Sequence, residues 1–252
     1  MTMIFHIARR ELRQMVRTPY AWLLAAVLLF IAGVFYAFGL AGYADYAAQS
    51  AMYGEEISVV QGVVEQFVVV MGLLLVLFMP LVTMRLFEAE QRQGAMALLL
   101  SSPVSSTEIV LGKWLGMMGF WSLLLVGGFA YIPITLYWFA SPPPGPIIAG
   151  FCGLFLLSSL GTGIGLMASS LSRSPLLAAA LSWCGLMILW VLSFTADMEN
   201  ELATLGKYLG LSGHLEGMAA GLISTDDIGF FVIGTLFCLF VAQQRVESHR
   251  WS

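Results

Sequence analysis

The side chains that could act as a nucleophile, a general base or a metal ligand are few in this sequence and far apart. No H-E-x-x-H run and no G-x-S-x-G run accompanies the three histidines, which are His6, His214 and His249. The cysteines are odd in number and lack the spacing of a zinc site: Cys152, Cys184 and Cys238. A nucleotide-binding G-x-x-x-x-G-K-S/T run is also missing. The sequence therefore predicts no catalytic residue, no metal site and no cofactor of its own.

The charged side chains that do gather lie in residues 85–113, between two long apolar runs. Glu88, Glu90 and Arg92 extend the preceding helix, and Gly94 interrupts it. A short helix then follows, with an apolar ridge at i, i+3 and i+4 made of Met96, Leu99 and Leu100. This ridge favours a docking site for another protein. A loop whose leucines dip into lipid is the alternative.

The same stretch also contains signals for the end of one helix and the start of the next. The residue before Pro103 is pushed out of the helical region, so the short helix ends there, before Val104. Ser105 to Glu108 then has the spacing of a capping box, which predicts a new helix running through Lys113. The segment therefore reads as helix, turn, helix.

The elements that must position this segment are membrane helices. With 59% hydrophobic and 10% charged residues, the chain cannot be an ordinary soluble domain. A bilayer span needs about 20 largely apolar residues. The prolines at 142–144 break the longest charge-free stretch into two spans. We expect an all-α integral membrane protein with one domain over 20–252 and six spans, at about 20–41, 61–84, 114–139, 147–171, 175–195 and 228–244.

The basic residues predict the orientation of these spans. Of the 11 lysines and arginines, only Lys207 falls on the side opposite the termini. The others lie on the side of the termini and of the 85–113 loop: Arg9, Arg10, Arg13, Arg17, Arg85, Arg92, Lys113, Arg173, Arg245 and Arg250. Since cytoplasmic segments carry the excess of positive charge, the termini and the loop are expected in the cytoplasm.

Residues 1–19 have the pattern of an amphipathic helix that lies in the membrane interface. Its apolar positions recur at helical spacing: Ile4, Ile7, Ala8, Leu12, Met15 and Val16. The arginines lie on other faces, where they would meet anionic lipid headgroups. The alternative is that these arginines only set the topology.

The spans give only weak indications of a transport path. Glu65 stands about 30 Å before Arg85 along a helix, which places it near the outer interface as a candidate pore-mouth residue. Ser158, Ser159 and Thr162 share a small-residue face with Gly161 and Gly165. That face fits close helix packing, and a lining role for cargo is the alternative.

The run from Leu86 to Gly116 resembles the signature loop of type-2 ABC exporter permeases. The matching residues are Glu90, Arg92, Gly94, Leu98, Leu99, Leu100, Ser102, Pro103, Val104, Ile109, Gly112 and Lys113, whereas Ala95 replaces a commoner threonine. Residues 204–226 are similar to the external re-entrant segment of these permeases, although Ala220 stands where a basic residue is common. The length and basic tail look closest to the gliding-motility permease branch.

The resemblance implies a non-catalytic permease subunit of an ATP-driven exporter in the inner membrane. A cytoplasmic ATPase would bind ATP and Mg²⁺ and dock on the loop, at Glu88, Glu90, Arg92, Gly94, Met96, Leu99, Leu100, Pro103 and Val104. The spans would pair with a second permease copy or a paralogue, and an accessory protein could join outside; nucleic acid is not expected. A membrane anchor for an envelope complex, without cargo movement, is the alternative.

Overall fold

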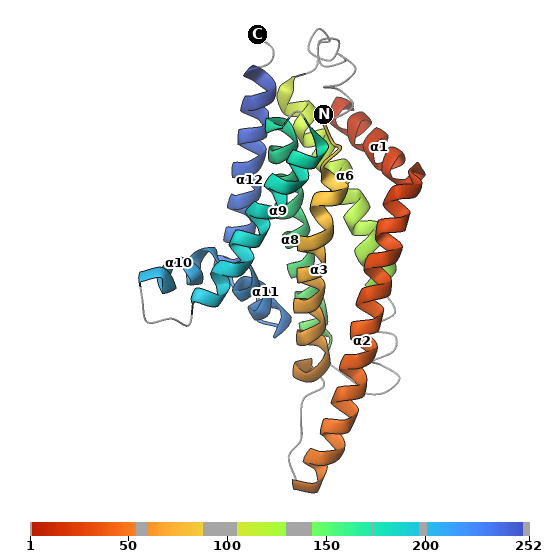
Figure 1. Ribbon diagram of the computed structural model, residues 1–252, viewed down its shortest axis with the longest axis vertical. Helices are drawn as coiled ribbons and strands as arrows, with labels where there is room; N and C mark the ends of the chain where they lie inside the picture. The colour runs from red at the N-terminus through yellow and green to blue at the C-terminus, as the bar shows by residue number, and fades with distance from the viewer. Residues whose placement is uncertain are drawn as a thin grey trace.

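The computed structural model describes residues 2–53, 60–87, 105–129, 143–172, 174–196 and 201–248. Every regular element in these ranges is a helix, as Figure 1 shows. Six of the helices are long and apolar enough to cross a membrane: Pro19–Ala48, Gly62–Thr83, Ser106–Gly128, Pro144–Leu171, Pro175–Thr195 and Thr225–Ser248. The predicted fold class, an all-α protein with six candidate spans, is confirmed.

The helices follow one another in the order of the spans, with short helices between the fifth and the sixth. They are α1 (Thr2–Arg17), α2 (Pro19–Tyr53), the π-helix η1 (Val60–Glu65), α3 (Gln66–Thr83), α6 (Ser106–Phe129), α8 (Pro144–Leu171), α9 (Pro175–Leu192), the 3-10 helix η2 (Ser193–Thr195), α10 (Glu201–Leu209), α11 (Leu211–Ala219) and α12 (Thr225–Ser248). Both termini lie at one end of the bundle (Figure 1).

Two of the described span boundaries differ from the predicted ones by more than four residues. The third span begins at Ser106 rather than near 114, because the helix starts directly at the capping box. The first helix continues to Tyr53, through residues 42–53, which contain no proline. With 35 residues, it is roughly 52 Å long at about 1.5 Å per residue, which exceeds the ~30 Å of a hydrocarbon core.

Helix α8 lies at the centre of the bundle and packs against α3, α6, α9, α11 and α12. It approaches α3 closely at the predicted small-residue face. A methyl group added at Gly161 would collide with Met79, and one added at Gly165 would collide with Thr83. The packing interpretation of Gly161 and Gly165 is therefore confirmed.

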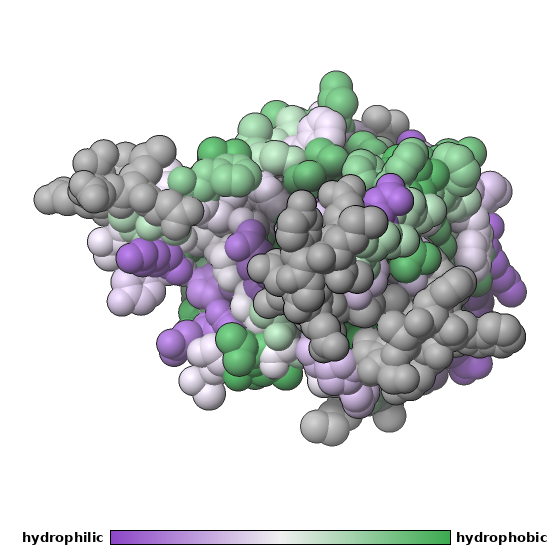
Figure 2. Space-filling view, turned by 90° about the horizontal axis from the view of Figure 1, so that it is seen from below, coloured by the Kyte–Doolittle hydropathy of each residue, from purple (hydrophilic) through white to green (hydrophobic). Residues whose placement is uncertain are grey.

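The outer helices leave much of their apolar surface uncovered within one subunit. Only 22% of the most apolar window of α2 is buried, against 67% for α8. Figure 2, seen from the end opposite the termini, shows the green apolar residues on the flanks of the bundle. This is the surface expected of helices that face lipid or another membrane helix.

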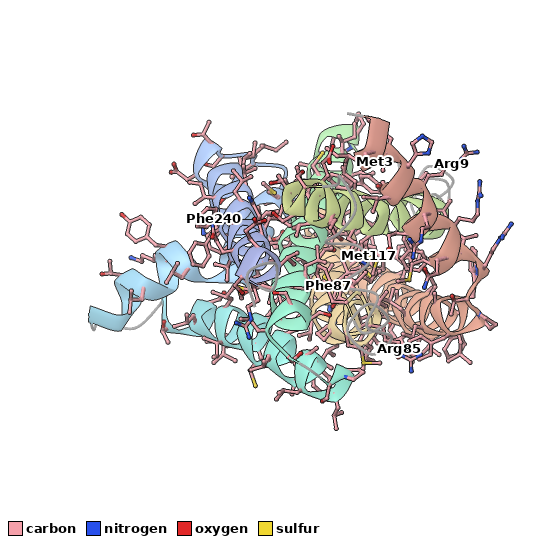
Figure 3. All side chains as sticks on the ribbon, turned by 90° about the horizontal axis from the view of Figure 1, so that it is seen from above. Met3, Arg9, Arg85, Phe87, Met117 and Phe240 are labelled. Atoms are coloured by element: carbon pink, nitrogen blue, oxygen red, sulfur yellow. The ribbon has the colours of Figure 1, made fainter. Side chains whose placement is uncertain are left out.

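Helix α1 lies across α6 at the end that carries the termini (Figures 1 and 3). The crossing is close because α6 has glycines there: a methyl group added at Gly112 would lie 2.7 Å from Cβ of Ile7, and one added at Gly116 would lie 2.7 Å from Cβ of Glu11. A methyl group added at Gly119, one turn further along, would lie 3.3 Å from Cδ2 of Leu12. The predicted apolar face of α1 thus packs on protein along this line.

Candidate functional site

The predicted ATPase-docking residues form one segment of the chain. Glu88, Glu90, Arg92, Gly94, Met96, Leu99, Leu100, Pro103 and Val104 all lie in 88–104, outside the described residues. The two chain ends that carry this segment are described: the turn after α3 and the start of α6. The site is therefore described from the two chain ends that hold the docking segment.

The turn after α3 is tied to the central helix α8. The backbone N–H of Leu86 donates to the Thr83 carbonyl (3.1 Å), which continues the helix into a tight turn. The N–H of Phe87 then donates to Oγ of Ser169 on α8 (3.1 Å). Phe87 is 1% exposed, so the chain leaves for residue 88 from a buried and hydrogen-bonded position.

The return end of the segment begins with the predicted capping box. The N–H of Glu108 donates to Oγ of Ser105 (3.2 Å), and the N–H of Ser105 donates to Oε2 of Glu108 (3.2 Å). Two of the free N–H groups at the start of α6 are thereby satisfied. The helix start predicted from this spacing is confirmed.

Lys113 joins both ends of the segment to α1. Its Nζ forms an ion pair with Oε1 of Glu11 at 3.0 Å and donates to the Leu86 carbonyl at 2.6 Å. It also lies 5.1 Å from the centre of the Phe87 ring. The side chains of Lys113 and Glu11 are 3% and 7% exposed. A charge buried this deeply is tolerated only when it is paired and hydrogen-bonded. The Lys113 ammonium therefore requires Glu11 and the Leu86 carbonyl at these positions.

Figure 3, viewed from the end with the termini, shows Phe87 and Met117 near the middle of the bundle and Arg9 pointing away from α1. Three parts of the chain therefore meet at one buried centre, which we call the Lys113 tie: Glu11 of α1, Leu86 and Phe87 after α3, and Lys113 of α6.

The candidate path residues lie apart from this centre. Glu65 is the last residue of η1 and is half-buried. Ser158 donates to the Leu154 carbonyl (2.7 Å), and the hydroxyls of Ser159 and Thr235 hydrogen-bond across α8 and α12 (3.1 Å). Thr162 is fully buried, and its Oγ1 has no hydrogen-bond partner among the described residues. In one subunit these α8 side chains face packed protein, so their role in transport stays a prediction.

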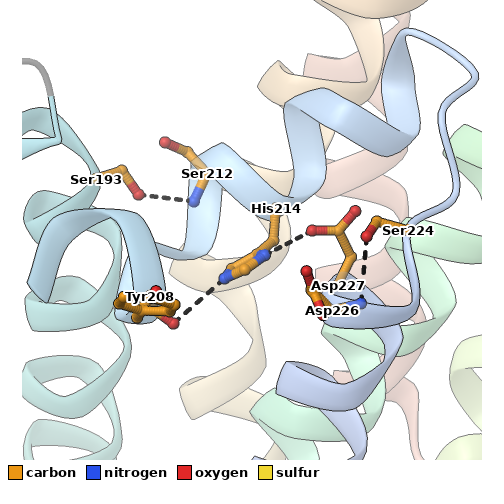
Figure 4. Close-up of polar contacts among 7 residues, drawn as sticks. All are labelled: Ser193, Tyr208, Ser212, His214, Ser224, Asp226 and Asp227. Atoms are coloured by element: carbon orange, nitrogen blue, oxygen red, sulfur yellow. Dashed lines mark hydrogen bonds and ion pairs between the residues drawn. The ribbon is translucent and has the colours of Figure 1, made fainter. Parts of the chain in front are cut away.

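A second polar centre lies between α10, α11 and the start of α12. Nδ1 of His214 lies 2.6 Å from Oδ1 of Asp227, and its Nε2 lies 3.3 Å from the Tyr208 carbonyl (Figure 4). The ring stacks on Phe230 with centroids 4.4 Å apart. We call this arrangement the His214 tie. These contacts make His214 a structural hydrogen-bonding residue that joins α11 to the start of α12.

Glu11 was not predicted as a functional residue from the sequence. Lys113 belongs to the family motif, but its ion-pair partner Glu11 lies 102 residues away along the chain. One indication was available: Glu11 is an acid on the face of α1 that also carries Ile7, Ala8 and Met15, in a segment whose other charges are arginines. An acid on the buried side of a basic helix predicts a buried basic partner.

Comparison with known protein families gives a match over most of the chain. A family model described as "ABC-2 family transporter protein" matches residues 5–205, which run from α1 into α10 and include the Lys113 tie. A search of curated proteins finds no match.

Proposed function

Because this chain belongs to the ABC-2 family of transporter proteins, whose members are membrane components that work with an ATP-binding subunit, we propose that it is the permease subunit of an ATP-driven exporter. In this proposal the end with the termini faces the cytoplasm, a separate ATPase docks on residues 88–104, and ATP-driven motion of that segment moves the spans. The membrane is the inner membrane. The ATPase holds ATP and Mg²⁺, since the sequence has no phosphate-binding loop of its own.

The observation that carries the proposal is the Lys113 tie. A docking segment transmits motion only if its ends are fixed to the parts that must move. Here the leaving end is bonded to α8 through Ser169, and Lys113 links the same end to α6 and α1. A push on the segment therefore reaches three helices through short polar contacts, which supports a mechanical role for the loop.

The apolar ridge supplies the contact with the ATPase. Met96, Leu99 and Leu100 would seat in a groove on the partner, with Glu88, Glu90 and Arg92 at its rim. Gly94, Pro103 and Val104 would shape the turns that present the ridge. The uncovered surfaces of α2 and α9 would face lipid or a second permease copy.

The docking step is tested by copurification. Leu99→Glu with Leu100→Glu places two charges on the ridge, and we expect the variant to lose the ATPase that copurifies with the wild-type chain. The matched control is Leu222→Glu with Ile223→Glu, two exposed apolar residues between α11 and α12. Normal binding and turnover of the ATPase with the ridge variant would contradict the docking role.

A membrane anchor without cargo movement is the second candidate, and the length of α2 favours it. About 20 Å of this helix exceeds a hydrocarbon core, which would suit a subunit that supports an envelope complex. Reconstitution separates the two: an exporter's ATPase activity responds to its cargo, and an anchor's does not. Membership of the gliding-motility branch stays a prediction from the resemblance.

A further inference from the structure

A cavity of about 150 Å³ opens beside the Lys113 tie, between α1, the start of α2, the end of α3 and α6. A single water molecule needs only about 10–15 Å³ of such space. The cavity therefore has room for a polar group much larger than one water.

The charges around this cavity do not balance. Three cations line it, Arg10, Arg85 and Lys113, against one carboxylate, that of Glu11. Glu11 is already paired with Lys113. Among the residues that the structure describes, neither Arg10 nor Arg85 has a carboxylate within ion-pair distance. Two exposed arginines without a carboxylate partner in the described part of the chain therefore line one cavity.

The walls between these charges are mainly apolar. Met15, Ala21, Val82 and Leu86 contribute the apolar part, and Gln14, Thr18 and Tyr20 also line the cavity. The cavity also lies at the level where spans end, because α2 begins at Pro19 and α3 ends at Thr83. A cavity with cationic edges and apolar walls at this level matches an amphiphile in the membrane better than it matches a dissolved ion.

The geometry also holds one of the arginines in place. The guanidinium carbon of Arg85 lies 5.0 Å from the centre of the Tyr20 ring, and the Tyr20 hydroxyl donates to the Leu81 carbonyl (3.4 Å). A cation–π contact of this kind restricts the Arg85 side chain, and the guanidinium fork is suited to two oxygens of a phosphate. Less entropy is then lost when the anion binds.

From these observations we propose that the cavity binds the phosphate of an anionic phospholipid headgroup between Arg10 and Arg85. The glycerol end of the lipid lies against Met15, Val82 and Leu86. The bound lipid bridges α1 to the end of α3, beside the Lys113 tie. The inference goes beyond the proposed export function and requires only that the spans cross a bilayer, whichever end faces the cytoplasm.

The test is lipid binding to the full chain in neutral detergent, measured by native mass spectrometry with phosphatidylglycerol and phosphatidylcholine of matched acyl chains. We expect the wild-type chain to retain phosphatidylglycerol preferentially. A basic residue near an anionic lipid contributes a factor of about five in affinity, so Arg10→Gln with Arg85→Gln should weaken phosphatidylglycerol binding roughly 30-fold.

The matched control is Arg9→Gln with Arg13→Gln. It removes the same charge from residues that are exposed, as Arg10 and Arg85 are, but do not line the cavity. Equal weakening in both double variants would mean a general attraction of α1 to anionic lipid and would overturn the proposal. So would equal retention of the two lipids by the wild-type chain.

A third measurement separates a lipid from a dissolved anion. If inorganic phosphate raises the thermal stability of the chain as much as phosphatidylglycerol does, and the gain depends on Arg10 and Arg85, the ligand is a free anion and the lipid assignment is wrong. A gain with phosphatidylglycerol alone supports the lipid.

Discussion

The Lys113 tie and the His214 tie are two polar centres in the described part of this helical bundle, and they differ in reach. Lys113 and Glu11 lie 102 residues apart and join α1, the turn after α3, and α6. His214 and Asp227 lie 13 residues apart and join α11 to the start of α12, with α10 alongside. The side chains of Lys113 and Glu11 are 3% and 7% exposed, and those of His214 and Asp227 are 11% and 14% exposed. The first tie organises the helices that carry the predicted docking segment, whereas the second stabilises a local turn between neighbouring helices.

Of the substitutions that test this difference, removing Lys113 should have the largest effect on stability. Lys113→Met leaves the Glu11 carboxylate buried without its ion-pair partner, and breaking such a pair costs about 3–5 kcal/mol. We expect a large loss of thermal stability in detergent, with increased hydrogen exchange in both α1 and the turn after α3.

The control for this prediction is the double variant Lys113→Met with Glu11→Leu. It removes both charges, so it should recover much of the stability that the single variant loses. If the single variant is as stable as the wild-type chain, the pair does not organise this end of the bundle.

Separating α1 from α6 should have an intermediate effect. Gly116→Leu places a side chain where an added methyl group already lies 2.8 Å from the Ala8 carbonyl oxygen. Overpacking of this kind costs about 1–3 kcal/mol, and we expect faster hydrogen exchange in α1 and a weakened Lys113 tie. Gly127→Leu in the same helix is the matched control, because no atom of the described residues lies within 4 Å of its added methyl group.

Breaking the local tie should have the smallest effect. His214→Gln keeps a hydrogen-bonding group but loses the aromatic stack and one of the two ring contacts, at a cost of about 1–2 kcal/mol. The increase in hydrogen exchange should be confined to α10, α11 and the start of α12. An equal increase in α1 would show that the two ties are coupled, contrary to the comparison.

The parts of the fold that could be predicted from sequence rest on local patterns. The spans follow from uninterrupted apolar runs, and the start of α6 follows from the spacing of Ser105 and Glu108. The close approach at Gly161 and Gly165 was predicted in the same way. Each of these depends on neighbours within a few residues, so the chain displays it directly.

The features that could not be predicted from the sequence depend on which helices pack against one another. The apolar spacing of α1 predicts a buried face but does not tell whether lipid or protein covers it. In the structure Gly112 and Gly116 let α6 cover that face along their line of contact. The pairing of Glu11 with Lys113 follows only from this crossing, which no local pattern specifies. The Arg10–Arg85 cavity is a result of the same crossing.

The distance along the chain between Glu11 and Lys113 also has a consequence for the order of assembly. Synthesis proceeds from the N-terminus at about 5–20 residues per second, so Glu11 is made roughly 5–20 seconds before its partner. During that interval α1 has no α6 to pack on, and its carboxylate must stay in water at the membrane surface. The arginines of α1 are suited to hold it there until the third span inserts. Burial of Glu11 is thus a late event in biogenesis, completed only when α6 arrives.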